Sequence, residues 1–226
     1  MENIAVLIPC YNEELTIEQV IDDFKKILPS ATIYVYDNNS TDRTASIANK
    51  KGAIVKEVPI QGKGAVVRQM LKEIDADVYL MVDGDATYSA IYAPDMIRDV
   101  ASGKYDMVIG DRLTGNYFDN NSRLFHGIGN KLVKFLVNKK FNGKLADIMT
   151  GYRAFNNKIA KEFVPTHDGF EVETELSIFA LTHNVKVGNC PIIYKDRPNG
   201  SKSKLHTISD GIKVIKCILK AKEKQV

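Results

Sequence analysis

The sequence lacks several features that mark common classes of protein. It has no tryptophan, only three cysteines, and no apolar run close to the ~18 residues that a membrane-spanning helix needs. Cys10, Cys190 and Cys217 are far apart and form no CxxC pair, so we expect buried thiols rather than a disulfide framework or a zinc site. The N-terminus has no basic segment followed by an apolar stretch, so we expect no signal peptide and no independent membrane span.

Common nucleotide-binding and metal-binding patterns are also missing. No GxGxxG motif follows the first predicted strand and no GxxxxGK[ST] motif occurs anywhere, which argues against a dinucleotide-binding or P-loop protein. The four histidines have no metal-ligand spacing. Without tryptophan, and with the other aromatics spread through predicted core strands, the chain offers no stacking platform for nucleic acid.

The composition that remains fits one globular domain. With 226 residues, of which 44% are hydrophobic and 26% charged, the chain can bury a full core but is too short for two large domains. The net charge of +3 is unevenly distributed, because residues 195–226 contain nine Lys or Arg and three acids. We therefore expect one domain over residues 1–205 and a basic amphipathic helix over residues 206–226, suited to anionic lipid or phosphate ligands.

The first hundred residues alternate short β-branched segments with helical patterns. This alternation predicts βαβ units, and hence a single α/β, Rossmann-like domain with a mostly parallel central sheet flanked by helices. The expected strands in this part are 4–8, 32–36, 53–58 and 78–82, and the expected helices are 16–28, 41–50 and 64–74. Beyond them we expect strands at 107–110 and near 185–193, helices at 123–141 and near 171–183, and a terminal helix.

Polar residues follow three of the predicted strands, at 9–14, 37–40 and 83–85. Ligands of an open parallel sheet bind beyond the carboxyl ends of its strands, so these segments should converge on one cleft. Asp83 and Asp85 flank Gly84, a turn that lets two carboxylates approach one Mg²⁺ or Mn²⁺ ion and share it with a phosphate. An isolated Asp-Gly-Asp is equally compatible with a plain polar turn, and the neighbouring strand ends favour the metal site.

Seven segments, in this order and spacing, resemble the family 2 glycosyltransferases of GT-A fold. They are 8–14 (IPCYNEE), 36–44 (YDNNSTDRT), 63–65 (KGA), 83–85 (DGD), 147–155 (DIMTGYRAF), 169–175 (GFEVETE) and 197–205 (RPNGSKSKL). The last three are similar to the subgroup that glycosylates polyprenyl phosphates, which includes dolichyl-phosphate mannose synthase. The resemblance covers nearly the whole chain. It implies an inverting, metal-dependent hexosyl- or N-acetylhexosaminyltransferase that uses a nucleotide-sugar.

The resemblance also implies roles for individual residues. The implied donor-binding residues are Pro9, Tyr11, Glu13, Asp37, Lys63, Asp83 and Gly84, with Asp83 and Asp85 as metal ligands. The implied catalytic residues are Asp85, Arg112 and Asp147, and the implied acceptor or phosphate contacts are Arg123, Arg197, Ser201 and Lys202. The chain departs from many relatives at two places. Asn38-Asn39 replace an acid and a glycine, and Thr87 replaces a metal-binding glutamine.

The implied acceptor, an undecaprenyl or dolichyl phosphate, simplifies the expected mechanism. Its nucleophilic oxygen is already anionic, so no strong general base is needed and positioning with charge neutralisation suffices. Direct displacement then inverts the anomeric centre. We expect Asp147 to orient acceptor, metal or sugar, with a cap of the following turn as the alternative. A UDP-sugar is favoured as donor, GDP-mannose is the alternative, and the sequence does not name the sugar.

Two helical stretches carry an apolar stripe beside a basic one. They are Ile208, Ile212, Ile215 and Leu219 with Lys213, Lys216, Lys220 and Lys224, and Leu124, Ile128, Leu132 and Phe135 with Arg123, Lys131, Lys134, Lys139 and Lys140. Such helices can lie in an anionic membrane interface, although packing of the apolar stripe on the body is the alternative. We expect peripheral association with the cytoplasmic face of the membrane, with self-association or an integral membrane partner as alternative anchors.

Three other functions remain open at this stage. The acceptor could be a saccharide or protein hydroxyl, which would require a true base. The chain could be a non-catalytic nucleotide-sugar-binding subunit of a membrane complex. A nucleotidyltransferase is disfavoured because no Gly-rich basic loop follows the first strand. Glu171, Glu173 and Glu175 open a predicted helix, where acids are favourable for any function, and Glu173 is the one we assign to the cleft.

Overall fold

The computed structural model describes residues 2–114, 124–205 and 207–222, with side chains omitted at 124–126 and 207. Its strands are β1 (Ile4–Cys10), β2 (Thr32–Asp37), β3 (Ile54–Glu57), β4 (Val78–Met81), β5 (Met107–Asp111), β6 (Arg153–Asn156) and β7 (Val187–Pro191). Its helices are α1 (Ile17–Ile27), α2 (Thr44–Lys50), α3 (Lys63–Glu73), α4 (Ala93–Ala101), α5 (Leu124–Lys140), α6 (Asn157–Glu162), α7 (Val172–Thr182) and α8 (Thr207–Lys220), with a 3-10 turn η1 (Ala90–Tyr92).

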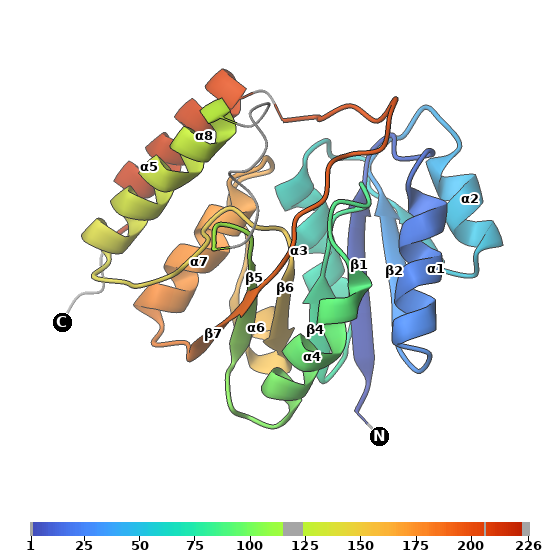
Figure 1. The fold of residues 1–226 in the computed structure, drawn as a ribbon, viewed down its shortest axis with the longest axis horizontal. Coiled ribbons are helices and arrows are strands. Elements are labelled where there is room, and N and C mark those ends of the chain that lie inside the picture. The colour runs from blue at the N-terminus through green and yellow to red at the C-terminus, as the bar shows by residue number, and fades with distance from the viewer. Residues whose placement is uncertain (1, 115–123, 206, 223–226) are drawn as a thin grey trace.

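The strands form one sheet in the order β3-β2-β1-β4-β6-β5-β7 (Figure 1). β6 runs antiparallel to β4 and β5, and the remaining pairs are parallel. The predicted α/β domain with a mostly parallel sheet is therefore confirmed. The strand β6 was not predicted, because a four-residue segment that contains an arginine and ends in an asparagine has no apolar run to mark it.

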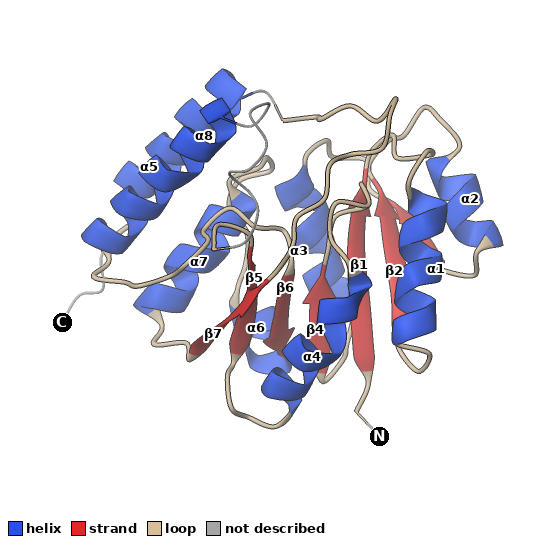
Figure 2. Ribbon diagram, viewed as in Figure 1, coloured by secondary structure: helices blue, strands red, loops and turns tan. Residues whose placement is uncertain are grey.

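Helices cover both faces of the sheet, which explains why β1 is apolar at almost every position (Figure 2). Successive side chains of a strand point to opposite faces. Ala5 and Leu7 accordingly pack in the cluster that contains residues of α3, α6 and α7, whereas Val6 and Ile8 pack in the cluster that contains residues of α1, α2 and α4. The central strands are thus buried between two hydrophobic layers.

The helices α5 and α8 lie side by side at one end of the molecule, next to α7 (Figure 1). Val133 and Val137 of α5, and Val214 and Ile218 of α8, belong to the same buried cluster as α7. A hydrogen bond also joins α5 to α8, since Nζ of Lys140 donates to the carbonyl oxygen of Ile218 at 2.9 Å. Each helix therefore buries part of its apolar surface on the body. Among the described residues, no helix combines the length and the apolarity that a membrane span requires.

The topology brings the polar strand ends together. β1 lies between β2 and β4, so the chain order reverses around β1 and the segments after these three strands meet at one edge of the sheet. After β7 the chain returns across this edge to reach α8 (Figure 1). We call residues 195–205 of this return the C-terminal strap. The strap and the strand ends enclose the candidate site.

Candidate functional site

A cavity of about 660 Å³ opens at the carboxyl ends of β1 and β4 and extends to α5 and α8. Most of the predicted site residues line it, namely Pro9, Tyr11, Glu13, Lys63, Asp83, Gly84, Asp85, Arg112 and Arg197. Asp37 and Asp147 are buried and are not among the lining residues. Ser201 and Lys202 also lie outside the lining, and Arg123 falls outside the described residues.

The turn that follows β4 depends on two close approaches. A Cβ added to Gly84 would lie 2.7 Å from the sulfur of Cys10, so the residue between the two aspartates has no room for a side chain. A Cβ added to Gly151 would lie 2.7 Å from both carboxylate oxygens of Asp83. These glycines let the Asp83 carboxylate and the 147–152 loop pack together at the cavity wall.

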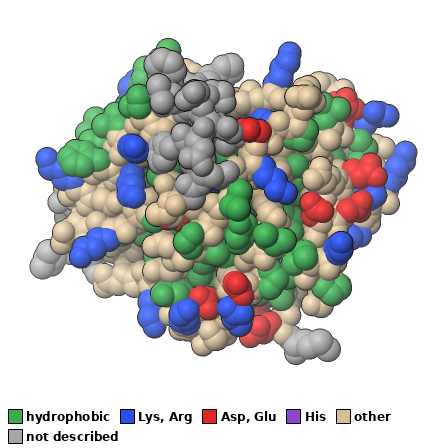
Figure 3. Space-filling model, viewed as in Figure 1, with side chains coloured by type: hydrophobic (Ala, Val, Ile, Leu, Met, Phe, Trp, Pro, Cys, Tyr) green, Lys and Arg blue, Asp and Glu red, His purple; other side chains and the backbone are tan. Residues whose placement is uncertain are grey.

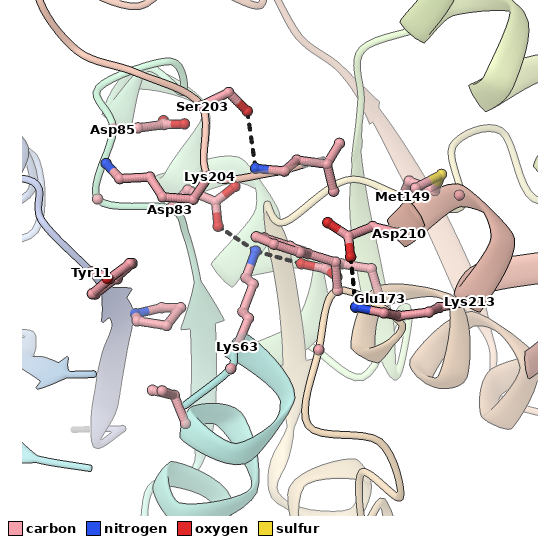
Figure 4. Close-up of a pocket in the computed structure, with 18 of the residues that line it drawn as sticks. Tyr11, Lys63, Asp83, Asp85, Met149, Glu173, Ser203, Lys204, Asp210 and Lys213 are labelled. Carbon is pink, nitrogen blue, oxygen red and sulfur yellow. Dashed lines mark hydrogen bonds and ion pairs between the residues drawn. The ribbon is translucent and has the colours of Figure 1, made fainter. Parts of the chain in front are cut away.

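Lys63 joins two carboxylates inside the cavity (Figure 4). Its ammonium forms ion pairs with Asp83, at 2.5 Å, and with Glu173 at the start of α7. Burial by itself would lower the pKa of Lys63, but the two carboxylates outweigh burial and raise the pKa above its ordinary value. Lys63 is therefore a fixed cation at the first turn of α3, and Glu173 is the one predicted glutamate of α7 that lines the cavity.

The C-terminal strap supplies two further cations. Arg197 lies 2.5 Å from the carboxylate of Asp85 and 3.5 Å from that of Glu13. Lys204 lies 2.6 Å from Glu13 and donates to the carbonyl oxygen of Asn12 at 2.7 Å. Burial raises the pKa of Glu13, and these strap cations offset that rise only in part. Glu13 and Asp85 are thus each matched by a basic side chain of the strap.

The donor set suits a hard divalent cation. Asp83 and Asp85 present carboxylate oxygens from one tight turn, and Mg²⁺ or Mn²⁺ typically binds through one or two such groups together with phosphate oxygens. In the structure Lys63 and Arg197 compensate these two charges. One oxygen of Asp85 also accepts from the backbone N–H and hydroxyl of Thr87, at 3.1 and 2.6 Å, which fixes its orientation. The residues present therefore fit a metal site whose basic neighbours would turn toward an anionic ligand.

Arg112 and Asp147 form a buried, two-point ion pair. The guanidinium donates from Nε and Nη2 to the two carboxylate oxygens at 2.7 and 3.0 Å. Asp147 also accepts from the backbone N–H of Met149 at 3.2 Å, so it caps the following turn as well. Burial would lower the pKa of Arg112, but Asp147 raises it well above its ordinary value. Because Arg112 lines the cavity and Asp147 does not, Asp147 acts on the cavity through Arg112.

Arg153 supports the same loop from beneath. Its fully buried guanidinium donates to the carbonyl oxygens of Thr150 and Ile148, at 3.0 and 2.6 Å, and to the hydroxyl of Ser177 at 2.8 Å. Burial lowers the pKa of Arg153 to about 10. The unpredicted strand β6 therefore places a cation where it ties the 147–152 loop to α7.

Asn38, one of the two departures noted after β2, holds the loop that leads to α3. Its side-chain amide donates to the carbonyl oxygens of Val58 and Ile60, at 2.9 and 2.7 Å. Its side-chain oxygen accepts from Gln61 at 3.0 Å and from the backbone N–H of Gly62 at 2.6 Å. An amide can both donate and accept, which an acid at this position could not do. Asn38 thereby positions Lys63 from a neighbouring strand end.

Asp37 has one carboxylate oxygen available. Its Oδ2 accepts from the backbone N–H of Ser40 at 3.0 Å, whereas its buried Oδ1 has no hydrogen-bond partner among the residues that the structure describes. A buried polar atom without a partner is unfavourable, and a ligand often supplies the missing donor. Asp37 is therefore suited to accept from an N–H or O–H group of a bound molecule.

Two lysines that line the cavity were not assigned to it from the sequence. The motif 197–205 contains Lys202 and Lys204, and we assigned phosphate contact to Lys202, whereas Lys204 is the lysine that lines the cavity. No periodicity separates neighbouring lysines in an irregular segment, so their directions depend on the path of the strap. Lys213, which pairs with Asp210 at 2.9 Å, also lines the cavity, whereas in the sequence it belongs to the basic stripe of the terminal helix.

The contact between Gly151 and Asp83 gives a testable prediction. Gly151→Ala is expected to weaken Mn²⁺ binding by about tenfold, because the new Cβ would push the Asp83 carboxylate from its place and a shift near 1 Å can cost up to ~10²-fold in function. Titration calorimetry measures the affinity and a thermal melt reports the fold. Unchanged Mn²⁺ affinity in a folded variant would show that Asp83 does not need this position to hold the ion.

The chain is similar to known proteins over most of its length. Residues 5–164 match the family model described as "Glycosyl transferase family 2". Glycosyltransferase AglJ of Haloferax volcanii is 36% identical over 209 residues, which cover 92% of this chain and 68% of AglJ. A dolichyl-phosphate hexose transferase of the same organism is 30% identical over 219 residues, which cover 97% of this chain and 93% of that protein.

Solved structures share the fold. Glucosyl-3-phosphoglycerate synthase from Mycobacterium tuberculosis, in complex with Mn²⁺, UDP and glucosyl-3-phosphoglycerate, superposes with a TM-score of 0.75 at 21% sequence identity. The match covers 96% of this chain and 79% of that one. At this level of identity the similarity concerns the arrangement of helices and strands.

Proposed function

The chain belongs to glycosyl transferase family 2, and from that premise we propose that it transfers a sugar from a nucleoside-diphosphate sugar, with UDP favoured, to a polyprenyl phosphate. The observation that carries the proposal is one continuous cavity with two different ends. At the strand ends it is lined by Asp83, Asp85 and basic side chains, whereas at α5 and α8 the apolar side chains of Leu132, Val133 and Ile215 line it together with two glycines and three polar residues. The similarity to a dolichyl-phosphate hexose transferase supports the same acceptor class.

The donor would bind at the strand ends. Tyr11 is 37% exposed on the cavity wall beside Pro9, where a flat nucleoside base can pack against it. The unpartnered oxygen of Asp37 would accept from the base or ribose. A Mg²⁺ or Mn²⁺ ion held by Asp83 and Asp85 would supply positive charge to the departing diphosphate. The solved relative that contains Mn²⁺ and UDP supports this choice of cofactor and nucleotide.

The cations of the site have a second task in this scheme. With the aspartates engaged by the ion, Lys63 and Arg197 are no longer needed to neutralise them and can donate to the diphosphate oxygens. Arg112 is held by Asp147 in one orientation, so its charge is available at a fixed place on the cavity wall. Fixed donors of this kind favour the charge that develops on the leaving group.

The acceptor would approach from the α5 and α8 end. A phosphate oxygen is already anionic at neutral pH, so the cavity needs no side chain to remove a proton from the nucleophile. This agrees with Asp147, the predicted catalytic carboxylate, being fully buried against Arg112. Attack on the anomeric carbon opposite the departing diphosphate would invert its configuration.

The outer faces of α5 and α8 favour peripheral attachment to an anionic membrane. Large apolar side chains remain exposed there, including Phe135 at 58%, Leu219 at 66% and Ile208 at 79%. Figure 3 shows hydrophobic and basic side chains gathered together over the end of the molecule formed by α5. A basic residue near an anionic surface contributes about 1 kcal/mol to binding. The same two helices would thus bring the cavity to the lipid that carries the acceptor.

A transfer assay tests the proposal. Radiolabelled UDP- and GDP-sugars are incubated with undecaprenyl phosphate in the presence of Mn²⁺ or Mg²⁺, and the organic phase is counted. We expect a lipid-linked product that disappears when EDTA removes the metal. No product from any donor with either ion would refute the proposal, and transfer to a saccharide without lipid would support a hydroxyl acceptor instead. Sedimentation of the protein with phosphatidylglycerol vesicles tests the membrane attachment.

A further inference from the structure

The cavity contains two helical glycines whose lack of a side chain is not explained by packing. Gly129 of α5 and Gly211 of α8 both line it. A Cβ added at either position would have no atom within 4 Å apart from its chain neighbours and the backbone of its own helix. Glycine inside a helix costs about 1 kcal/mol relative to alanine, and close packing is the usual compensation. Neither glycine has that compensation.

Other glycines of the cavity differ in this respect. A Cβ on Gly62 or Gly64 would lie 2.1 Å from a backbone oxygen of residues 167–168, and Gly84 is similarly restricted by a cysteine sulfur. Those positions exclude a side chain because the neighbouring atoms leave no space. At Gly129, which is exposed, and at Gly211, which is half-buried, the opposite holds, since a side chain at either position would enter open space.

The cavity wall near the two glycines combines apolar side chains with the polar side chains of Asn130, Asp210 and Lys213, and its apolar part reaches the surface. The nearby cavity wall includes Leu132, Val133, Met149, Leu205 and Ile215. Leu132 is 46% exposed and continues the apolar stripe that Ile128 and Phe135 form on the outer face of α5. The cavity therefore offers a passage of mixed lining from the charged strand ends, and the apolar side chains of this passage continue onto the surface that we assign to the membrane.

Charged groups mark the two ends of this passage. Figure 4 shows Met149, Asp210 and Lys213 on the far side of Lys63 from Tyr11 and Asp85. The ammonium of Lys213 pairs with Asp210 at 2.9 Å and its side chain is 56% exposed. A molecule with an anionic head and an apolar chain would match the cavity if its head lay near Lys63 and Arg112 and its chain lay along the apolar wall.

We propose that Gly129 and Gly211 form a notch between α5 and α8 through which the apolar chain of the phosphate-bearing acceptor leaves the cavity, so that residue size at these positions determines which acceptors bind. This inference rests on the proposed function, because it takes the acceptor class from it. The occupant is a lipid chain because the notch joins the phosphate-transfer site to the exposed apolar stripes.

Filling the notch tests the inference. Gly129→Leu and Gly211→Leu add large side chains that are favourable in helices, so they should leave the fold intact. We expect each to weaken binding of undecaprenyl phosphate in detergent micelles by about tenfold or more, which corresponds to ~1.4 kcal/mol. Gly129→Ala and Gly211→Ala, which add one carbon, should show a clearly smaller loss. Equilibrium binding without donor measures this, and titration of UDP with Mn²⁺ checks that the donor end is unchanged.

A short-chain probe separates the notch from the phosphate site. Isopentenyl phosphate carries the same anionic head on a five-carbon chain, so the leucine variants should bind it within about twofold of the wild type. The inference is overturned if the leucine variants bind undecaprenyl phosphate as well as the wild type does. It is also overturned if the wild type does not bind this lipid. A third outcome separates the two proposals. If the wild type binds undecaprenyl phosphate, the leucine variants lose this binding and the wild type transfers no sugar, the notch is upheld and the proposed function is rejected.

Discussion

Asp85→Asn is expected to lower kcat/KM for sugar transfer by about 1000-fold, which is about 4 kcal/mol of transition-state stabilisation. The amide keeps the size of the side chain and one oxygen to accept from Thr87, so the turn after β4 should persist. It removes the negative charge that pairs with Arg197 and that we assign to the metal ion. The loss should therefore fall on catalysis and Mn²⁺ affinity rather than on folding.

The control for this variant is Asp95→Asn on α4. Within the part of the chain that the structure describes, Asp95 forms an exposed ion pair with Arg98, so its replacement should leave activity within about twofold. Steady-state kinetics over a range of Mn²⁺ concentrations, with a thermal melt, compares the two variants. If the Asp85→Asn enzyme keeps activity within about threefold of the wild type, Asp85 is not a ligand of the metal ion.

Arg112→Met is expected to lower both stability and activity. It leaves the fully buried carboxylate of Asp147 without the two-point partner that now lies at 2.7 and 3.0 Å. Removing one partner of a buried ion pair typically costs about 3–5 kcal/mol, because the remaining charge stays in a medium of low polarity. The cavity wall also loses its fixed cation, so we expect activity to fall by about 100-fold or more.

A double variant separates the two effects. In Arg112→Met with Asp147→Asn the buried charge is gone, so most of the lost unfolding free energy should return while activity remains low. Urea unfolding measures the stability, and the transfer assay measures the activity. A double variant that regains both would assign the pair a structural role alone. One that regains neither would show that Asp147 contributes to the fold by more than its pairing with Arg112.

The sequence predicted the site residues whose positions depend on local sequence patterns, namely those that follow β1, β2 and β4. Asp83-Gly84-Asp85 follows a short buried strand, and the segments after β1 and β2 begin with polar residues, so their convergence follows from the rule for parallel sheets. β6 was missed because Arg153 breaks the apolar pattern of the strand, and its antiparallel direction needed knowledge of both neighbours. The choice between Lys202 and Lys204 was missed because neither lies in a regular element.

The position of Asp147 could not be predicted from its motif either. Its motif resembles that of a catalytic carboxylate, and a motif carries no information on whether the side chain faces the cavity or the interior. The structure places it at 0% exposure against Arg112, where it orients a cation. Burial depends on the packing of β5 and the 147–152 loop, which are separated by more than thirty residues along the chain.

What the sequence determined by itself was the α/β class, the order of the polar strand ends and the acidic turn with its candidate metal ligands. These follow from residue spacing, because side-chain direction within a strand or helix is periodic. Only the tertiary structure decided that the cavity extends to α5 and α8 and that a side chain at Gly129 or Gly211 would meet open space. Whether a helical glycine marks close packing or open space depends on the atoms opposite it, and those come from a distant part of the chain.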